Sequence, residues 1–487
     1  MTFVPLKKTF ISSGNTKWLL LIIFSLAFLF INIFLKGYFT NNIYTSGDEP
    51  HYMMMTDSLV QDGDFNLRND YLENRARGRY SMQNVFPHVS ATIDTNSTDR
   101  WFSIHTIGLP LLMYGPYKFF GLAGARLLIA SIQISSIFLF FIVLKKYLKN
   151  DKKVFLGILL IMSCTFFWQN LGALLPDLIA VTFGLAFIIL FGSKKLVTNI
   201  LLTILLFFGI LIHTKMALIL LPLYLGHNIV LIKKLGYREF ILLQMPCFVG
   251  LIILLASYAV FLKNQYGFYS PSGLYGSNGQ LFGANPFTNL IAILFDRVKG
   301  LIFYYPVMII AVPYLYFGIK DLCIATKKAS LKNFSTELVL ALSLAIGVVI
   351  LFITQISFSD WSGSFAPSGR YMLVPIFITI FLVAKYFNGK NRVELVLLSF
   401  TLIASIFISI GMIYRINIFR EMGFVYLSPG VDSIITQRFV MLQKLPLFEL
   451  LSAKSSFGQQ HKGAVLMLLY AMLSLVLIKY FGPNKSR

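Results

Sequence analysis

Apolar stretches long enough to cross a lipid bilayer recur along the whole chain. A spanning helix needs about 20 predominantly apolar residues. Of the 487 residues, 57% are hydrophobic and only 13% are charged, about half the charged share of a soluble domain. The apolar stretches lie at roughly 17–36, 125–144, 154–171, 174–192, 197–213, 216–232, 240–262, 301–319, 336–356, 371–387, 393–414 and 463–481. This pattern predicts an all-α polytopic membrane protein with about twelve helices in one domain over residues 1–487, beginning with an uncleaved helix.

The basic residues gather in alternate short loops. With the N-terminus in the cytoplasm, the inner loops hold 23 of the 42 Lys and Arg residues but 5 of the 20 Asp and Glu residues. Such a bias in short loops is the positive-inside pattern of membrane proteins. It accounts for the net charge of +22 without nucleic acid, and it places both termini in the cytoplasm.

The long polar segments fall on the opposite, outer side. They run over residues 37–124, 263–300 and 415–462. Long loops of this kind usually carry function, so we expect any chemistry to face outward. The three cysteines give no disulfide framework.

Two adjacent carboxylates, Asp48 and Glu49, open the first of these loops. Pro50 follows them, and apolar residues recur at helical spacing before Gly63, which predicts a short amphipathic helix along the membrane surface. Acids at a membrane boundary are candidates for function. The alternative is that they only cap this helix.

Five further segments follow this acidic pair in a characteristic order. They are WFSIHTIGLPLLMYGPYKFFGLAGARL (101–127), LLPDLIAV (174–181), ILIHTKMALILLP (210–222), FDRVKGLIFYYP (295–306) and DWSGSFAPSGRYMLVP (360–375). Together they resemble the GT-C superfamily of glycosyltransferases, in particular the branch with protein O-mannosyltransferases and the lipid A aminoarabinose transferase. The chain differs from that branch in lacking Pro-Pro-Gly after His105 and an inserted luminal domain, which weakens the expectation of a protein acceptor.

The resemblance implies an inverting transfer of a hexosyl or pentosyl group from a polyprenyl-phosphate donor. Asp48, with Glu49 beside it, would be the base that takes a proton from the acceptor hydroxyl. Asp177 and His105 would orient the acceptor, although both residue types also begin helices in many proteins. The acceptor would be a glycolipid, an envelope polysaccharide or a protein.

Two cations and two aromatic residues complete the expected site. Arg370 and Lys215 would stabilise the phosphate as the sugar–oxygen bond breaks, unless they only extend to the membrane interface. Trp361 and Tyr371 would pack against a sugar ring. The spacing of the acids predicts no metal site, although some superfamily members use a divalent ion with paired acids.

Two other function classes also fit the sequence. A twelve-helix chain also suits a transporter or a flippase for lipid-linked sugars, but such proteins more often show inverted repeats and interrupted helices. A catalytically inactive scaffold is the third alternative. The expected location is the cytoplasmic membrane of a cell, with the site on its outer face.

Overall fold

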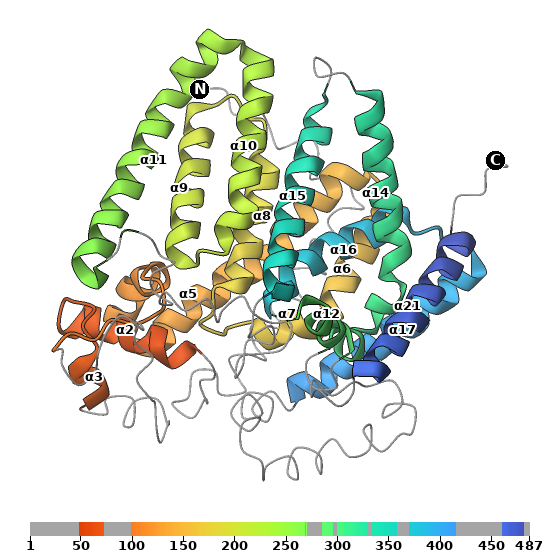
Figure 1. Ribbon diagram of the computed structural model, residues 1–487, viewed down its shortest axis with the longest axis horizontal. Coiled ribbons are helices and arrows are strands. Elements are labelled where there is room, and N and C mark those ends of the chain that lie inside the picture. The colour runs from red at the N-terminus through yellow and green to blue at the C-terminus, as the bar shows by residue number, and fades with distance from the viewer. Residues whose placement is uncertain are drawn as a thin grey trace, which may run out of the picture.

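All regular elements in the described part of the chain are helices. The computed structural model describes residues 48–72, 99–267, 269, 285–295, 300–329, 334–357, 370–414 and 460–481. Figure 1 shows the helices packed side by side, with short helices below them. The predicted all-α class is confirmed. Helices suit an apolar chain because each one satisfies its own backbone hydrogen bonds within the segment.

The long helices form the body of the bundle. They are α5 (Gly108–Leu148), α8 (Asp177–Leu190), α9 (Leu196–Ile212), α10 (Met216–Leu235), α11 (Tyr237–Tyr266), α14 (Ala311–Lys328), α15 (Thr336–Ser357), α16 (Leu373–Tyr386), α17 (Arg392–Tyr414) and α21 (Gln460–Phe481). The short elements are α2 (Glu49–Gln61), α3 (Arg68–Leu72), α6 (Asp151–Met162), α7 (Thr165–Asn170), α12 (Pro286–Phe295), α13 (Leu301–Tyr304), η5 (Pro306–Ile310) and η6 (Arg370–Met372).

Six helices among the described residues are long and apolar enough to cross a membrane. They are α5, α10, α11, η5 continued by α14, α15, and the first 18 residues of α17. The chain is therefore a multi-pass membrane protein. The predicted number of twelve is not confirmed, since α8, α9 and α12 are shorter apolar helices and the predicted span 17–36 lies outside the described residues.

Two predicted spans have different boundaries in the structure. The helix predicted over 125–144 begins at Gly108 and kinks at Gly121, where φ is 60°. The span predicted over 154–171 breaks at Ser163 and Cys164 into α6 and α7. Glycine tolerates the positive φ at the kink. A broken helix is possible in the second case because other parts of the protein bury the break and satisfy its backbone.

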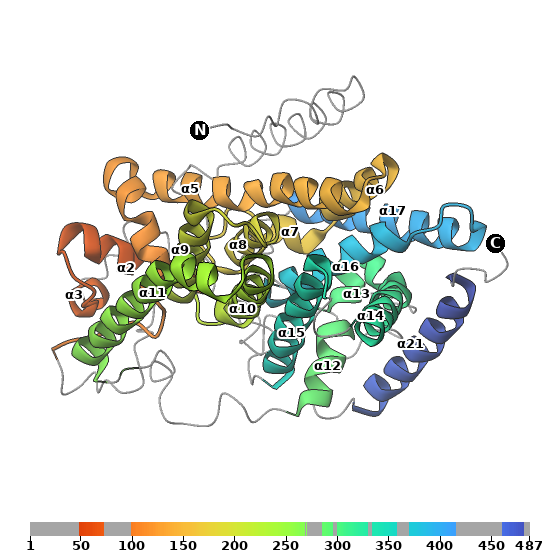
Figure 2. The ribbon, with the colours of Figure 1, turned by 90° about the horizontal axis from the view of Figure 1, so that it is seen from above.

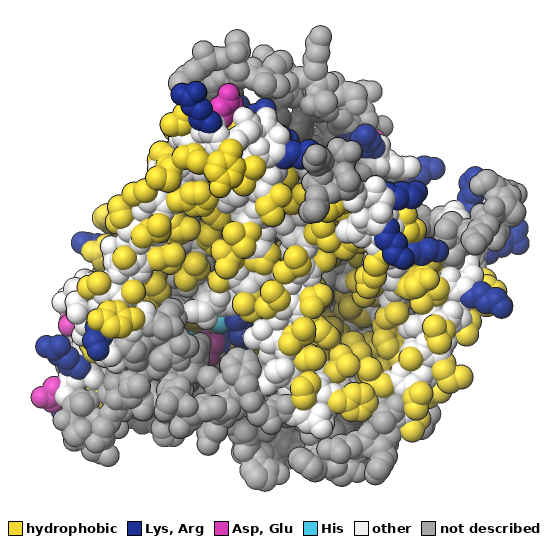
Figure 3. Space-filling view, turned by 45° about the horizontal axis from the view of Figure 1, so that its top comes forward, with side chains coloured by type: hydrophobic (Ala, Val, Ile, Leu, Met, Phe, Trp, Pro, Cys, Tyr) yellow, Lys and Arg dark blue, Asp and Glu magenta, His cyan; other side chains and the backbone are white. Residues whose placement is uncertain are grey.

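The helices form two layers. Seen from above, α5, α6 and α17 run across one side of the molecule, while α9, α10, α15 and α14 lie on the other side, lower in the view (Figure 2). Helix α10 packs closely against α15, and α5 packs against α8. The outward side chains of α11, α15 and α21 are mostly apolar, and Figure 3 shows a broad yellow face on this side of the molecule.

One end of the bundle is rich in lysine. There Lys234 Nζ donates to the Gly192 carbonyl at 2.9 Å, and Lys233 Nζ donates to the Phe334 carbonyl at 2.7 Å. Lys194 Nζ reaches the Lys234 carbonyl at 3.2 Å. Three basic loops that the charge pattern assigned to one side thus contact each other. We call this the lysine end, and the opposite end, which carries α2 and α3, the site end.

Helix α2 is buried rather than amphipathic. Its residues from Glu49 to Ser58 are all buried, and α2 packs against α5. The Tyr117 hydroxyl donates to Asp57 Oδ1 at 3.1 Å, so a polar residue of α2 is satisfied inside the protein. The burial of its polar side by other elements corrects the expectation of an amphipathic helix, and its place along the membrane surface stays a prediction.

Candidate functional site

The ends of five helical elements meet at the site end. Asp48 precedes α2, Asp177 begins α8, Lys215 precedes α10, and Arg370 begins η6 ahead of α16, while Gln355 lies in the last turn of α15. The N-terminus of a helix carries a partial positive charge. Several helix N-termini at one end of the bundle favour an anionic ligand there.

The central contact joins Asp48 to Arg370. Arg370 Nη1 donates to Asp48 Oδ2 at 2.8 Å, across 322 positions of sequence. The Arg370 side chain is 5% exposed and that of Asp48 is 25% exposed, so solvent screens the pair only in part. The Asp48 side chain makes no capping hydrogen bond to α2, and the alternative of a simple helix cap is therefore wrong for this residue.

Arg370 is held as a cation by its neighbours. Burial alone would lower its pKa, but Tyr371, Asp48 and Asp177 outweigh burial and raise the pKa above its usual value. Its Nη2 donates to the Tyr371 hydroxyl at 2.6 Å. Its Nε is buried without a hydrogen-bond partner among the described residues, which leaves one donor for a ligand.

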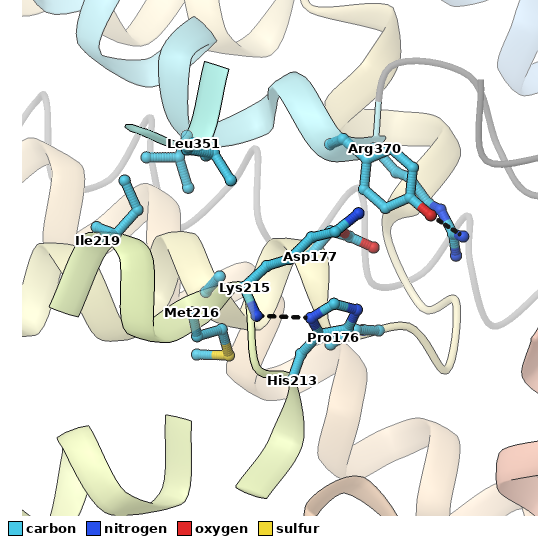
Figure 4. Close-up of a pocket in the computed structure, with 11 residues that line it drawn as sticks. Pro176, Asp177, His213, Lys215, Met216, Ile219, Leu351 and Arg370 are labelled. Atoms are coloured by element: carbon cyan, nitrogen blue, oxygen red, sulfur yellow. Dashed lines mark hydrogen bonds between the residues drawn. The ribbon is translucent and has the colours of Figure 1, made fainter. Parts of the chain in front are cut away.

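Lys215 and His213 form the wall opposite Arg370 (Figure 4). Lys215 Nζ lies 3.8 Å above the Tyr371 ring and 3.5 Å from Gln355 Oε1. The Lys215 backbone N–H donates to His213 Nδ1 at 3.1 Å, which requires that nitrogen to be unprotonated. Desolvation, with the Lys215 and Arg370 charges, lowers the pKa of His213 to about 3. His213 is thus a neutral acceptor.

Asp177 lies between these two cations. It lines a small cavity together with His213, Lys215, Arg370 and Tyr371. Asp177 Oδ2 is buried and accepts no hydrogen bond from the part of the chain that the structure describes. The cavity measures about 30 Å³, which is room for one or two water molecules. A larger ligand would have to displace side chains.

His105 belongs to an aromatic group behind Asp48. Its Nε2 is 3.9 Å from Asp48 Oδ1, and its ring lies 4.9 Å from that of Tyr52 and 5.6 Å from that of His51. His51 Nδ1 is in turn 2.8 Å from the Tyr71 hydroxyl. This packing fixes His105 next to the carboxylate.

Glu49 points away from this group, and its carboxylate accepts a backbone hydrogen bond. It is fully buried, and its Oε1 accepts the Leu174 N–H at 2.8 Å. Its charge also acts on buried Arg126 of α5. Gln133 makes hydrogen bonds to the backbone of Gly172 and Ala173. Together, Gln133 and Glu49 satisfy backbone groups in the non-helical stretch between α7 and α8. The structure therefore separates the two adjacent acids, with Asp48 on the Arg370 side chain and Glu49 on the Leu174 backbone.

The remaining predicted residues fall in different places. Tyr371 lies at the site, with its ring facing Lys215 and Arg370, whose Cζ is 4.5 Å from the centroid. Trp361 lies outside the described residues. The described residues contain no group of three or more His, Cys, Asp or Glu side chains suited to a metal ion.

Sequence reasoning missed His213 and Arg126. His213 stands two positions before Lys215 in the string Ile-His-Thr-Lys, so a search for polar residues next to the predicted cation could have found it. Arg126 falls at the start of the span predicted over 125–144, where basic residues often extend to the membrane interface. A charge in the middle of a longer apolar helix would have indicated a buried partner.

Comparison with protein-family models, with curated proteins and with solved structures gives no match for this chain. The interpretation of the site therefore depends on its geometry and on the sequence patterns.

Proposed function

We propose that this protein is a membrane glycosyltransferase that moves a sugar from a polyprenyl-phosphate donor to an acceptor outside the cytoplasm. The observation that carries the proposal is the contact between Asp48 and Arg370, since Arg370 also lines the small cavity together with Asp177 and Lys215. Such a transfer needs a base for the acceptor hydroxyl and cations for the phosphate. Two acids and two cations of this kind lie within one small site.

Arg370 and Lys215 are the proposed phosphate ligands. Arginine can hold two phosphate oxygens, whereas lysine acts as a point charge. Negative charge grows on the phosphate oxygen as the bond to the sugar breaks, and fixed cations stabilise that charge. The helix N-termini around the site add to this effect.

Asp48 is the proposed base. When a donor phosphate binds Arg370, it competes with the carboxylate for the same guanidinium, which releases Asp48 Oδ2 toward the acceptor. The acceptor oxygen then attacks the anomeric carbon from the face opposite the phosphate, and its proton passes to Asp48. Asp177, whose Oδ2 lacks a donor among the described residues, would accept a hydrogen bond from the acceptor.

Several finer features belong to the same proposal. The chain would have the GT-C fold with about twelve helices, and the site end would face outward from the cytoplasmic membrane. His105 would hold Asp48 in position. Tyr371 would pack against the sugar only after Lys215 moves from its ring, since that contact now covers a face of the ring.

The test is release of polyprenyl phosphate from a panel of polyprenyl-phosphate sugars in detergent, with envelope lipid as acceptor. We expect Asp48→Asn to lower kcat at least 100-fold with little change in KM, and Arg370→Gln to raise KM for the donor as well. Asp57→Asn is the matched control, because it makes the same change inside α2, the helix that Asp48 precedes, at a residue bonded to Tyr117.

Two results would contradict the proposal. Unchanged turnover in folded Asp48→Asn protein would show that Asp48 is not the base. Flux of a lipid-linked sugar through reconstituted vesicles, without any sugar transfer, would favour the transporter alternative.

A further inference from the structure

A second and much larger cavity opens at the lysine end, between α6, α14, α16, α17 and α21. It measures about 930 Å³. Ligand sites in proteins measure roughly 300–1,000 Å³, so this cavity could hold a substantial molecule. It is separate from the candidate site, and none of its lining residues takes part in the proposed transfer.

The mouth of the cavity is basic. Lys152, Lys153, Lys320 and Lys390 line it, and Asp321 is the one acid among its described lining residues. That acid is already engaged, since it accepts the Tyr386 hydroxyl at 2.7 Å and lies 4.0 Å from Lys385 Nζ.

One further carboxylate lies close to the cavity. Glu394 is buried and accepts hydrogen bonds from the Tyr314 hydroxyl at 2.7 Å and from the Asn388 N–H at 3.0 Å. The four lysines of the lining outnumber these two carboxylates, so the cavity keeps a net positive charge for a ligand.

The inner wall is apolar and follows one face of α17. Leu395, Leu398 and Leu402 recur there at spacings of three and four, with Leu156, Phe317 and Phe481 around them. Seven helical residues correspond to about 10 Å, so the wall extends well below the lysines. The neighbouring outward side chains of α17, Phe400, Ile403 and Phe407, are exposed and apolar, as a surface facing lipid would be.

We propose that this cavity binds an anionic phospholipid, with the headgroup phosphate at the lysines and the upper acyl chains along α17. A basic mouth above an apolar wall matches the two parts of such a molecule. Basic pockets between membrane helices recognise anionic headgroups in this way. A phosphate group could also come from a soluble compound. Such a compound would contact the lysines but not the leucine wall, so the wall distinguishes a lipid from a soluble phosphate.

The first experiment is a lipid titration of the purified full chain in detergent, followed by native mass spectrometry. The probes are phosphatidylglycerol and phosphatidylcholine with identical acyl chains. We expect stronger binding of phosphatidylglycerol. A lysine near a membrane surface contributes about five-fold in affinity, so Lys320→Gln with Lys390→Gln should weaken that binding by roughly 25-fold.

The matched control is Lys327→Gln with Lys328→Gln, which removes the same charge at the end of α14 outside the cavity lining. Equal losses in the two double variants would overturn the proposal, because general surface charge would then explain the binding. Equal affinity of the wild type for both lipids would overturn it as well.

A third variant separates lipid from soluble phosphate. Ser399 lines the wall, so Ser399→Trp should fill the space for the acyl chains and weaken phosphatidylglycerol binding while all lysines remain. If Ser399→Trp binds the lipid normally and glycerol phosphate competes at equal concentration, the cavity is a site for soluble anions and the lipid proposal is wrong. Far-UV circular dichroism checks the fold of each variant.

Discussion

The contact between Asp48 and Arg370 should stabilise the fold measurably. Arg370 is 5% exposed and the distance is 2.8 Å, so the contact belongs with charge-assisted hydrogen bonds, which contribute about 1.5–3 kcal/mol. Exposed ion pairs contribute only about 0–1 kcal/mol. Because Asp48 is 25% exposed, we expect a coupling free energy of about 2 kcal/mol.

A double-mutant cycle isolates this coupling from the other effects of each substitution. Its members are wild type, Asp48→Asn, Arg370→Gln and the double variant. Asp48→Asn alone should cost up to about 3 kcal/mol, since it leaves a buried guanidinium beside a neutral amide. The double variant should be less destabilised than the sum of the two single variants.

The assay is reversible unfolding in mixed micelles of dodecyl maltoside and sodium dodecyl sulfate, followed by far-UV circular dichroism. A coupling below about 0.5 kcal/mol would refute the reasoning, because it would be within the range of solvated surface pairs. The same variants should be assayed for sugar transfer, which separates a loss of fold from a loss of function.

Three further predictions concern the support of the site. Gly108→Ala should destabilise the protein by about 1–3 kcal/mol or more, because a Cβ there would lie 2.3 Å from backbone of α9, whereas Gly115→Ala, with nothing within 4 Å, should not; thermal unfolding of both variants compares them. His213 is neutral when folded, with its pKa lowered to about 3 from 6.5, so the unfolded chain binds more protons between these values and stability should fall as pH drops below 6.5, by up to about 1.4 kcal/mol per pH unit. His213→Asn should flatten that dependence in unfolding curves recorded from pH 7 to 4.5, and an unchanged slope would contradict the assignment. Glu49→Ala should lower the free energy of unfolding by about 3–5 kcal/mol, because it leaves the buried Arg126 charge without this carboxylate. Adding Arg126→Met should restore part of that loss, whereas full additivity of the two free-energy changes would argue against their coupling.

Some features of the site were predictable because they are local. Asp48, Asp177 and Lys215 each stand next to a proline or a polar string at the edge of an apolar run, and these edges become helix ends. All three reach the same end of the bundle. Arg370 was also named from the sequence, but its pairing with Asp48, 322 positions away, has no local signal.

The different surroundings of Asp48 and Glu49 could not be predicted. The two are adjacent in sequence, yet one reaches Arg370 and the other accepts the Leu174 N–H. Helix geometry turns successive side chains by about 100°, so neighbours face different elements. Which element each one meets depends on how α5, α8 and η6 pack around α2.

The amino-acid sequence by itself determined the class of this protein and its helical content. Long apolar runs with few charges can satisfy their backbone in lipid only as internally bonded structures, and the lysine loops identify one end of the bundle. Only the tertiary structure decided which helices break, that α2 is buried, and which acid meets a cation. Those features depend on contacts between distant segments, where the hydrogen-bonding need of a buried group on one helix is met by a side chain of another.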